Sequence, residues 1–296
     1  MRGRSPYRLF GSFHPVGMAA PLGIRSEAVP DNPGLSCTSK IIPLNGMPVR
    51  LKVSYSLDKG ILPLDYRRGF ASLLKEAIKR SDAHRYRRYY FRHHVLKPFT
   101  FSVFFPGLKG VESSSQKRLR VGSEAVLYFS TWDSELGVAI YNSLLSISEY
   151  PLFEDRLRRK KLLLLPNQVI TQERAVFGTM APVLINTKGE AGTYLLPGEA
   201  GFAEGLEFAV QEVSRAFLEM PEVKVRFRSI FHRRKVVHHY AMCMQGFVGV
   251  FELEAPPQVL NLLYYVGLGM RRSQGFGMLK LINTSHPETS SIESGL

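Results

Sequence analysis

Hydrophobic and polar positions alternate from Met47 onward, so that Val49, Leu51 and Val53 fall on one face of an extended segment. A period of two predicts a β-strand with one buried face. The apolar residues that follow recur at helical spacing: Phe70, Leu73, Leu74, Ala77 and Ile78. This second pattern predicts a helix, and Asp65 stands where it could cap the first turn.

The two periods continue through the first half of the chain. Alternation predicts a strand that begins at Phe99 and another over Arg118 to Ser130, after a loop rich in Gly and Ser. A second helix is expected to start near Asp133 or Ser134, and a fourth strand within 162–165 or 168–171. The order strand, helix, strand, strand, helix, strand is that of the ferredoxin-like unit.

The same order repeats in the second half. The predicted elements are a strand over 181–185, a helix over 199–220, alternation from Val223, a long or hairpinned strand over 235–253, a helix after Pro256-Pro257 and a strand from Phe276. We therefore predict an α+β chain of tandem ferredoxin-like (RRM-like, βαββαβ) domains. The expected divisions are 1–46, a disordered or non-native extension; 47–170 and 171–284, the two domains; and 285–296, a disordered tail.

Composition restricts the partner. The 296 residues are 45% hydrophobic, enough for a substantial core, and carry a formal net charge of +14 with an isoelectric point of about 9.8. Such a charge implies an acidic partner, either nucleic acid or an anionic membrane. No apolar run approaches the roughly 18 residues of a membrane-spanning helix. Cys37 and Cys243 cannot form a disulfide framework or a cysteine zinc site, which fits a reducing cytoplasm.

The segment from Gly267 to Gly277 places two Gly-apolar-Gly units around Arg271 and Arg272. Glycine permits positive φ and close backbone approach, and the bare amides of such a loop can cradle a phosphate. The two guanidinium groups add fork-shaped donors that suit a polyanion. We therefore predict that the loop binds phosphates, through both arginines and the glycines Gly267, Gly269, Gly275 and Gly277.

Two other interpretations compete for this loop. A dinucleotide fingerprint needs a third glycine three residues after the second and lies between a strand and a helix. Arg272 occupies that position, and the loop instead follows a helix and precedes a strand. We therefore expect no nucleotide cofactor; an ordinary glycine-rich turn remains the alternative.

Three clusters of cations favour RNA over a membrane, because no basic helix carries a lipid-facing stripe. The first, His84 to Lys97, interleaves aromatic residues with Arg85, Arg88 and Arg92 and is typical of sites that stack unpaired bases. An amphipathic helix with solvated arginines is the alternative interpretation. The other clusters are 156–161, phosphate-facing or simply solvated, and 232–235, which contains Arg233 and Arg234 and is expected at a turn between strands.

The run Leu268 to Met278, Phe251 to Glu254 upstream, and the patch Lys97 to Ser102 closely resemble the CRISPR-associated endoribonucleases that cut repeat transcripts into guide RNAs. The resemblance extends more weakly over most of 47–283. It implies that the ribose 2′-OH attacks the adjacent phosphorus without metal or cofactor, leaving a 2′,3′-cyclic phosphate and a 5′-OH.

The resemblance also implies a catalytic set. His93 and His94 stand where the family places its general base or acid, and Lys97 where it places the lysine that stabilises the phosphorane. Some members carry a tyrosine near the position of Lys75, so Lys75 substitutes for it, or Tyr90 or its neighbour Tyr89 reaches the site, or the role is missing. Surface histidines, or metal ligands lacking a nearby Cys, Asp or Glu, are the alternatives for the first pair. His238-His239 is the second candidate pair, interpreted as structural or RNA-facing.

Two functions are therefore compatible with the sequence. One is a metal-independent endoribonuclease acting on CRISPR repeat RNA; the other is a non-catalytic RNA-binding subunit of a CRISPR ribonucleoprotein. The expected partners are the repeat RNA and a CRISPR effector complex, with no membrane, for a cytoplasmic monomer or homodimer. A usable histidine beside Lys97 favours the enzyme.

Overall fold

The computed structural model describes residues 46–112, 118–187, 193–240 and 242–282. These described residues belong to one compact unit. The expected extension 1–46, apart from Gly46, and the expected tail 285–296 lie outside the described residues. Within the described ranges, no helix is long and apolar enough to cross a bilayer.

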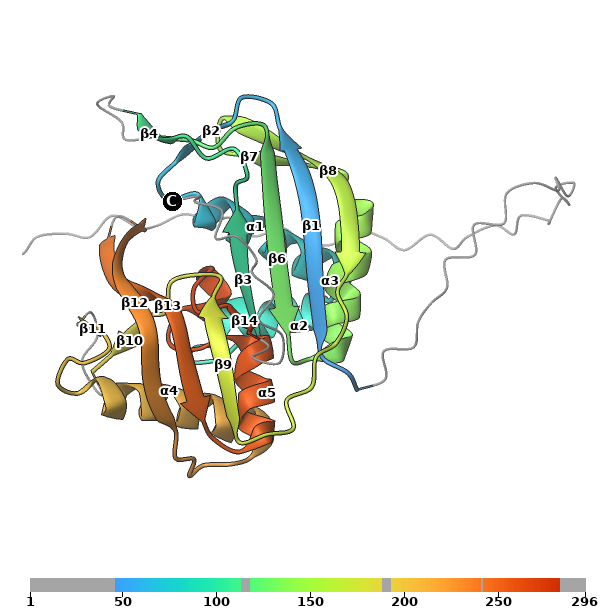
Figure 1. Ribbon diagram of the computed structural model, residues 1–296. Coiled ribbons are helices and arrows are strands. Elements are labelled where there is room, and N and C mark those ends of the chain that lie inside the picture. The colour runs from blue at the N-terminus through green and yellow to red at the C-terminus, as the bar shows by residue number, and fades with distance from the viewer. Residues whose placement is uncertain (1–45, 113–117, 188–192, 241, 283–296) are drawn as a thin grey trace, which may run out of the picture. The chain divides into compact units, whose positions relative to one another are not determined.

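The first half builds an antiparallel sheet with the strand order β3-β6-β1-β8-β7 (Figure 1). Three short strands, β2, β5 and β4, form a separate small sheet. The bounds are β1 Val49–Leu57, β2 Ile61–Pro63, β3 Phe99–Phe104, β4 Gly110–Glu112, β5 Arg118–Arg120, β6 Glu124–Thr131, β7 Glu149–Leu152 and β8 Asp155–Leu164. The segment expected as one strand over 118–130 is thus two, and the fourth strand begins earlier than predicted.

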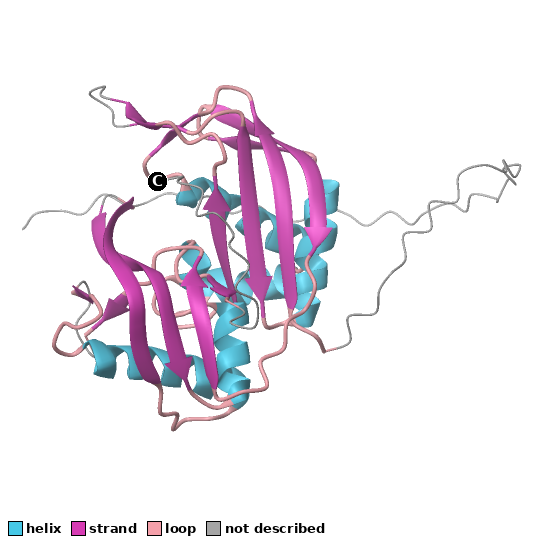
Figure 2. Ribbon diagram, viewed as in Figure 1, coloured by secondary structure: helices cyan, strands magenta, loops and turns pink. Residues whose placement is uncertain are grey.

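Helices cover one face of this sheet (Figure 2). They are α1 Arg67–Ser81, α2 Ala83–Phe91 and α3 Ser134–Ser146. The apolar stripe of α1 is buried as its spacing predicts, against the inward residues of β1. Asp133 caps α3 by accepting the backbone N–H of Leu136 at 2.9 Å, as expected.

Asp65 does not cap α1, so that prediction is wrong. Tyr66 occupies the N-cap position and makes no side-chain cap. The Asp65 carboxylate instead accepts from Nδ1 of His239 at 2.7 Å and from the backbone N–H of Tyr240 at 3.0 Å. A partner remote in sequence therefore competes successfully for the carboxylate.

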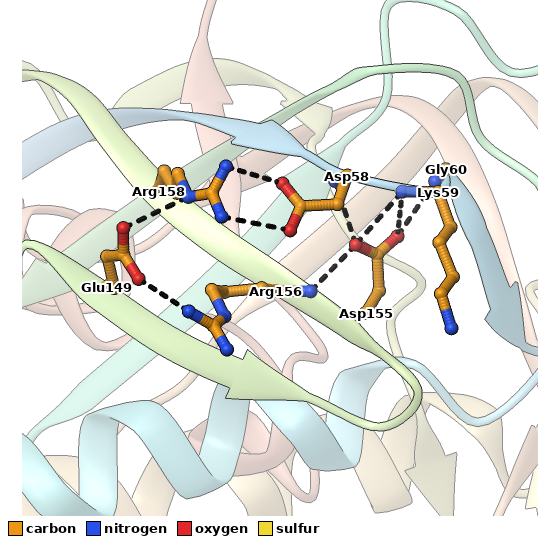
Figure 3. Close-up of polar contacts among 7 residues, drawn as sticks. All are labelled: Asp58, Lys59, Gly60, Glu149, Asp155, Arg156 and Arg158. Atoms are coloured by element: carbon orange, nitrogen blue, oxygen red, sulfur yellow. Dashed lines mark hydrogen bonds and ion pairs between the residues drawn. The ribbon is translucent and has the colours of Figure 1, made fainter.

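The second cationic cluster lies in β8, where two of its three arginines meet carboxylates (Figure 3). Arg156 bonds to Glu149, and Arg158 bonds to Glu149 and Asp58. Asp155 beside them accepts backbone N–H groups from the turn after β1 and from its own strand, at 2.7 to 3.2 Å. Because Arg156 and Arg158 already have carboxylate partners, this part of the cluster supports the turn.

The second half builds an antiparallel sheet with the order β12-β13-β9-β14, covered on one face by two helices (Figures 1 and 2). A short pair, β10 and β11, lies apart from it. The bounds are β9 Arg174–Thr179, β10 Ile185–Asn186, β11 Tyr194–Leu195, α4 Phe202–Leu218, β12 Arg226–His239, β13 Met242–Glu254, α5 Pro257–Val266, the 3-10 turn η1 Arg272–Gln274 and β14 Leu279–Leu281.

Two predictions for this half are wrong. The first strand is β9, not 181–185; the latter segment is buried, but Val183 makes only an isolated bridge to Phe247. Burial on all sides gave 181–185 the apolar composition of a strand. The 232–235 cluster lies inside β12 rather than at a turn, because β12 and β13 pair as far as His239 and Met242.

The strand orders confirm the fold class. In each half, the first and third strands of a βαββαβ unit lie between the second and the fourth, which is the ferredoxin-like arrangement; in the first half, β7 extends the sheet beyond the fourth strand. Each half has its own apolar core. The two halves contact each other where β3 and α1 meet the turn η1, and where α5 meets β3 and β6.

Candidate RNA-processing site

The glycine loop connects α5 to β14 and folds back tightly on itself. Gly267, Gly269, Gly275 and Gly277 all have positive φ, between 71° and 90°. A Cβ at Gly277 would clash with the carbonyl oxygen of Leu268, and one at Gly269 with the backbone near β10. Glycine is therefore required here by both backbone conformation and close approach.

Several N–H groups of the loop donate to backbone carbonyls of the protein. Gly267 donates to the carbonyl of Leu263 at 2.8 Å, Gly275 to that of Arg272 at 3.1 Å, and Gly277 to that of Pro182 at 2.8 Å. These three N–H groups cannot also cradle a phosphate in this conformation. Phosphate binding by the loop stays a prediction, which rests on its arginines and on its other amides, that of Gly269 among them.

Three side chains of the first half hold the loop and the strand after it. Thr100 Oγ1 donates to the carbonyl of Phe276 at 2.9 Å, and Arg67 Nε to that of Gly275 at 3.2 Å. Arg50 Nη2 donates to the carbonyl of Leu279 at 2.9 Å. The patch that starts at Lys97 and the glycine motif, far apart in the sequence, are thus structurally coupled.

Arg272 is buried, with 7% of its surface exposed, and its guanidinium makes no hydrogen bond or ion pair with any residue the structure describes. Burial lowers the pKa of its guanidinium to about 10, so the group stays charged near neutrality. An uncompensated buried charge is costly. A bound anion would offset that cost.

Arg271 is half-buried and has partners on both sides. Its Nε donates to the Tyr194 hydroxyl at 3.0 Å, and its Nη1 donates to Gln274 Oε1 at 3.2 Å. With φ of 54°, its backbone is left-handed, which turns the chain between the two Gly units. Tyr194 and Gln274 were not predicted, and nothing in their local sequence marks them.

Both arginines line one pocket of about 250 Å³. Its walls come from three remote segments: the stretch before β3, including Lys97; helix α4, including Phe208 and Glu212; and the glycine loop from Gly269 to Ser273. The pocket brings the predicted phosphate-stabilising lysine and the predicted phosphate-binding arginines together. Sequence analysis did not identify α4 as part of the site.

Lys97 is half-buried, and its ammonium nitrogen lies 3.9 Å from the centre of the Tyr90 ring. Lys75 lies over the same ring at 5.0 Å, and over Tyr86 at 5.8 Å. Desolvation, with the charge of Lys75 added, lowers the pKa of Lys97 to about 8. Burial raises the pKa of Tyr90, so its phenol is a poor proton source.

His93 and His94 lie in the exposed turn between α2 and Lys97, their ring centres 6.4 Å apart. His94 has a positive φ of 57°. Among the described residues, no hydrogen bond ties either imidazole to Lys97 or Tyr90. The other pair divides as its strand position predicts: His239 is buried at the end of β12, and His238 is exposed.

The remaining arginines differ in availability. Arg85 contacts the carboxylates of Asp82, Asp133 and Glu135, so its fork is occupied. Four other arginines are exposed: Arg88 on α2, Arg92 just after it, and Arg233 and Arg234 in β12. The helix α2 is amphipathic, with Tyr89 buried and its arginines mostly outward, an arrangement that suits RNA binding and simple solvation equally.

Residues 165–281 match the sequence model of the family described as CRISPR associated protein Cas6, C-terminal, which confirms the expected resemblance. No curated protein matches the chain in sequence. At the level of structure, the chain is similar to a Cas6-related protein of Pyrococcus furiosus, with 18% identity and a TM-score of 0.68 over 80% of this chain and 99% of that one.

Two further solved structures are similar. One, described as an RAMP protein binding different RNA substrates, has 18% identity and a TM-score of 0.67, covering 79% of this chain and 100% of its own. Another, described as CRISPR associated protein Cas6, has 20% identity and a TM-score of 0.62, covering 80% and 100%. At these identities the likeness establishes the fold.

Proposed function

We propose that this Cas6-like chain is a metal-independent endoribonuclease that cleaves CRISPR repeat RNA within its pre-crRNA transcript. Supporting this proposal is one observation above all: Lys97, with its lowered pKa, shares a pocket with Arg271 and the unpaired Arg272. Three cations around one cavity suit a phosphate that gains charge during reaction.

In the proposed reaction, one of His93 and His94 accepts the proton of the 2′-OH. The O2′–P bond forms, the P–O5′ bond breaks, and the leaving 5′-oxygen takes up a proton. The products are a 2′,3′-cyclic phosphate and a 5′-OH. The exposed histidine turn leaves both imidazoles free to meet RNA, and catalytic hydrogen bonds often form only in the complex.

Lys97 stabilises the phosphorane as an ammonium, since its pKa of about 8 keeps most of it charged at neutral pH. Tyr90 acts as the aromatic support under Lys97, not as a proton donor. Lys75 adds positive charge beside the same ring and so takes an electrostatic role in place of a tyrosine on α1.

The RNA backbone is bound by Arg271 and Arg272 in the pocket and by the exposed arginines of α2 and β12, at positions 88, 92, 233 and 234. Arg85 takes no part in this binding, because three carboxylates already compensate its charge. The glycines Gly267 and Gly277 contribute indirectly, because they let the loop fold so that its arginines reach the pocket.

The test is single-turnover cleavage of repeat RNA in excess EDTA, with end-group analysis. We expect cleavage to a cyclic phosphate and a 5′-OH, and no cleavage when the nucleotide before the cut carries 2′-deoxyribose. Binding of that deoxy substrate serves as the control. A requirement for Mg²⁺ would contradict the mechanism.

A non-catalytic RNA-binding subunit is the second candidate, favoured by the lack of any contact between the histidines and Lys97 within the described residues. It predicts tight, salt-dependent binding of repeat RNA with no strand cleavage under any of these conditions. Binding by an Arg271/Arg272 double alanine variant then separates the pocket's role from that of the surface arginines.

A further inference from the structure

His239 makes hydrogen bonds from both ring nitrogens to oxygen atoms. Its Nδ1 lies 2.7 Å from Asp65 Oδ1, and its Nε2 lies 3.1 Å from Gln274 Oε1. The same Gln274 oxygen accepts from Arg271 Nη1 at 3.2 Å. A chain of side chains therefore runs from the turn before α1, through the end of β12, to an arginine of the candidate RNA site.

The polarity of this chain depends on one proton. A carboxylate only accepts, so Nδ1 of His239 must donate to Asp65. Arg271 only donates, so it keeps the amide oxygen of Gln274 turned toward itself. His239 Nε2 can then face that oxygen only as a donor. The observed arrangement therefore requires the imidazolium form of His239.

In the neutral imidazole, the proton stays on Nδ1 beside Asp65, and Nε2 becomes an acceptor facing another acceptor. The Gln274 amide then turns over to offer its NH₂ to Nε2, and the same NH₂ faces Arg271 as donor against donor. The contact between Arg271 and Gln274 is lost. Arg271 keeps its bond to the Tyr194 hydroxyl and gains a free Nη1.

The groups around the ring act in both directions. Burial lowers the pKa of His239, the hydrogen bonds to Asp65 and Gln274 raise it, and the charge of Arg67 on α1 lowers it. Arg68 contacts Asp65 at 3.8 Å, and the rings of Tyr240 and Phe276 pack against the imidazole edge to face. Burial is the largest of these effects, so the neutral form prevails at neutral pH.

We propose that His239 is a positioning residue that controls Arg271 through Gln274: its protonated form binds Arg271 within the loop, and its neutral form releases Arg271 Nη1 for an RNA phosphate. This inference deepens the proposed function and rests on RNA binding by Arg271. It places a pH-sensitive contact on a residue that is not itself among those lining the pocket.

The first arm of the test uses the full chain without RNA. Imidazole ¹⁵N signals of His239 give its protonation state and tautomer as pH is varied. We expect the neutral form to carry its proton on Nδ1, the Gln274→Glu variant to titrate at higher pH because a carboxylate accepts permanently, and the Asp65→Asn variant to titrate at lower pH. A neutral form protonated on Nε2, or a titration unmoved by Gln274→Glu, overturns the inference.

The second arm measures repeat-RNA affinity with and without Arg271→Ala, at about pH 5 and about pH 8, on either side of the ordinary histidine range. In the unaltered chain, the affinity lost on Arg271→Ala should be several-fold larger at the higher pH. In a Gln274→Leu background, matched in size but unable to hold Arg271, the loss should not change with pH. A pH effect that persists in Gln274→Leu contradicts the relay.

The two arms separate the claims. If Arg271→Ala leaves affinity unchanged at both pH values, RNA binding by Arg271 and with it the proposed role of the relay are wrong, whatever the imidazole signals show. If affinity falls but the imidazole signals fail the first arm, the proposed function stands and the relay is wrong. Circular dichroism of each variant confirms that it is folded.

Discussion

The ammonium nitrogen of Lys97 lies 3.9 Å from the centre of the Tyr90 ring, and among the described residues it meets this aromatic face rather than a carboxylate. A cation over a ring keeps its charge available, whereas an ion pair would neutralise it. Desolvation lowers the pKa of Lys97 to about 8, so the position carries a cost in stability that its proposed role explains.

Replacing Lys97 by methionine should therefore stabilise the fold while removing activity. The uncharged side chain removes the desolvation cost, and we expect a gain of about 1 kcal/mol, less than the full pKa shift implies because the ammonium is partly solvated. Chemical denaturation measures the gain and single-turnover cleavage the loss. Lys79→Met, at an exposed position on α1, is the matched control and should change neither.

The rate of cleavage should fall as pH rises through about 8, the pKa of Lys97, because the ammonium is lost there. Lys97→Arg keeps its charge at all accessible pH values and should move this alkaline limb upward, even with a lower maximum rate. Stability should change in the opposite direction to the rate. In the unfolded chain a lysine keeps its proton to about pH 10.5, so between about pH 8 and pH 10.5 only the unfolded state binds this proton, and the free energy of unfolding rises with pH. An unchanged limb in Lys97→Arg would assign it to another group.

Alanine at His93 or His94 should separate their roles. General acid–base catalysis contributes about a hundred- to ten-thousand-fold, so the catalytic member should slow single-turnover cleavage by that order with affinity nearly unchanged. The other member should have a small effect. His232→Ala, an exposed histidine of β12, is the control; unchanged cleavage in the His93/His94 double variant would contradict the assignment.

Arg272→Met should raise stability and weaken binding of anions. The buried guanidinium has no partner among the described residues, so an apolar side chain of similar length removes an uncompensated charge. Repeat-RNA affinity should fall with a shallower salt dependence. Inorganic phosphate should raise the melting temperature of the unaltered chain more than that of the variant. Equal effects of phosphate on both chains would place its binding elsewhere.

Gly277→Ala should be strongly destabilising, by about 2 kcal/mol or more, because its φ of 71° and the clash of a Cβ with the Leu268 carbonyl act together. Gly198→Ala is the matched control: φ is 93°, but nothing lies within 4 Å of an added Cβ, so only the backbone strain of about 1 kcal/mol applies. Thermal unfolding of the two variants measures the difference. Similar losses would show that close packing of the loop is not what requires glycine.

The fold class could be predicted from the sequence, because the strands and helices of each βαββαβ unit show their own hydrophobic periodicity. The alternation from Val49 and the stripe from Phe70 to Ile78 reflect burial on one face of an element. Such one-sided burial produces a regular pattern among residues close in sequence. The prediction from periodicity was wrong where burial is complete. Residues 181–185 were predicted as a strand because all of them are buried. Periodicity cannot distinguish a strand from an irregular buried segment.

Only part of the candidate site could be predicted from the sequence. Gly267 to Gly277 and Lys97 could be found because their residue types are unusual, but their shared pocket exists only where the stretch before β3, helix α4 and the loop meet in space. The tertiary structure also decided which charges are compensated: Arg85 beside three carboxylates, Arg272 with no partner among the described residues. Charge is local in a sequence, whereas its compensation depends on residues as remote as Asp58 and Arg158, which are 100 positions apart.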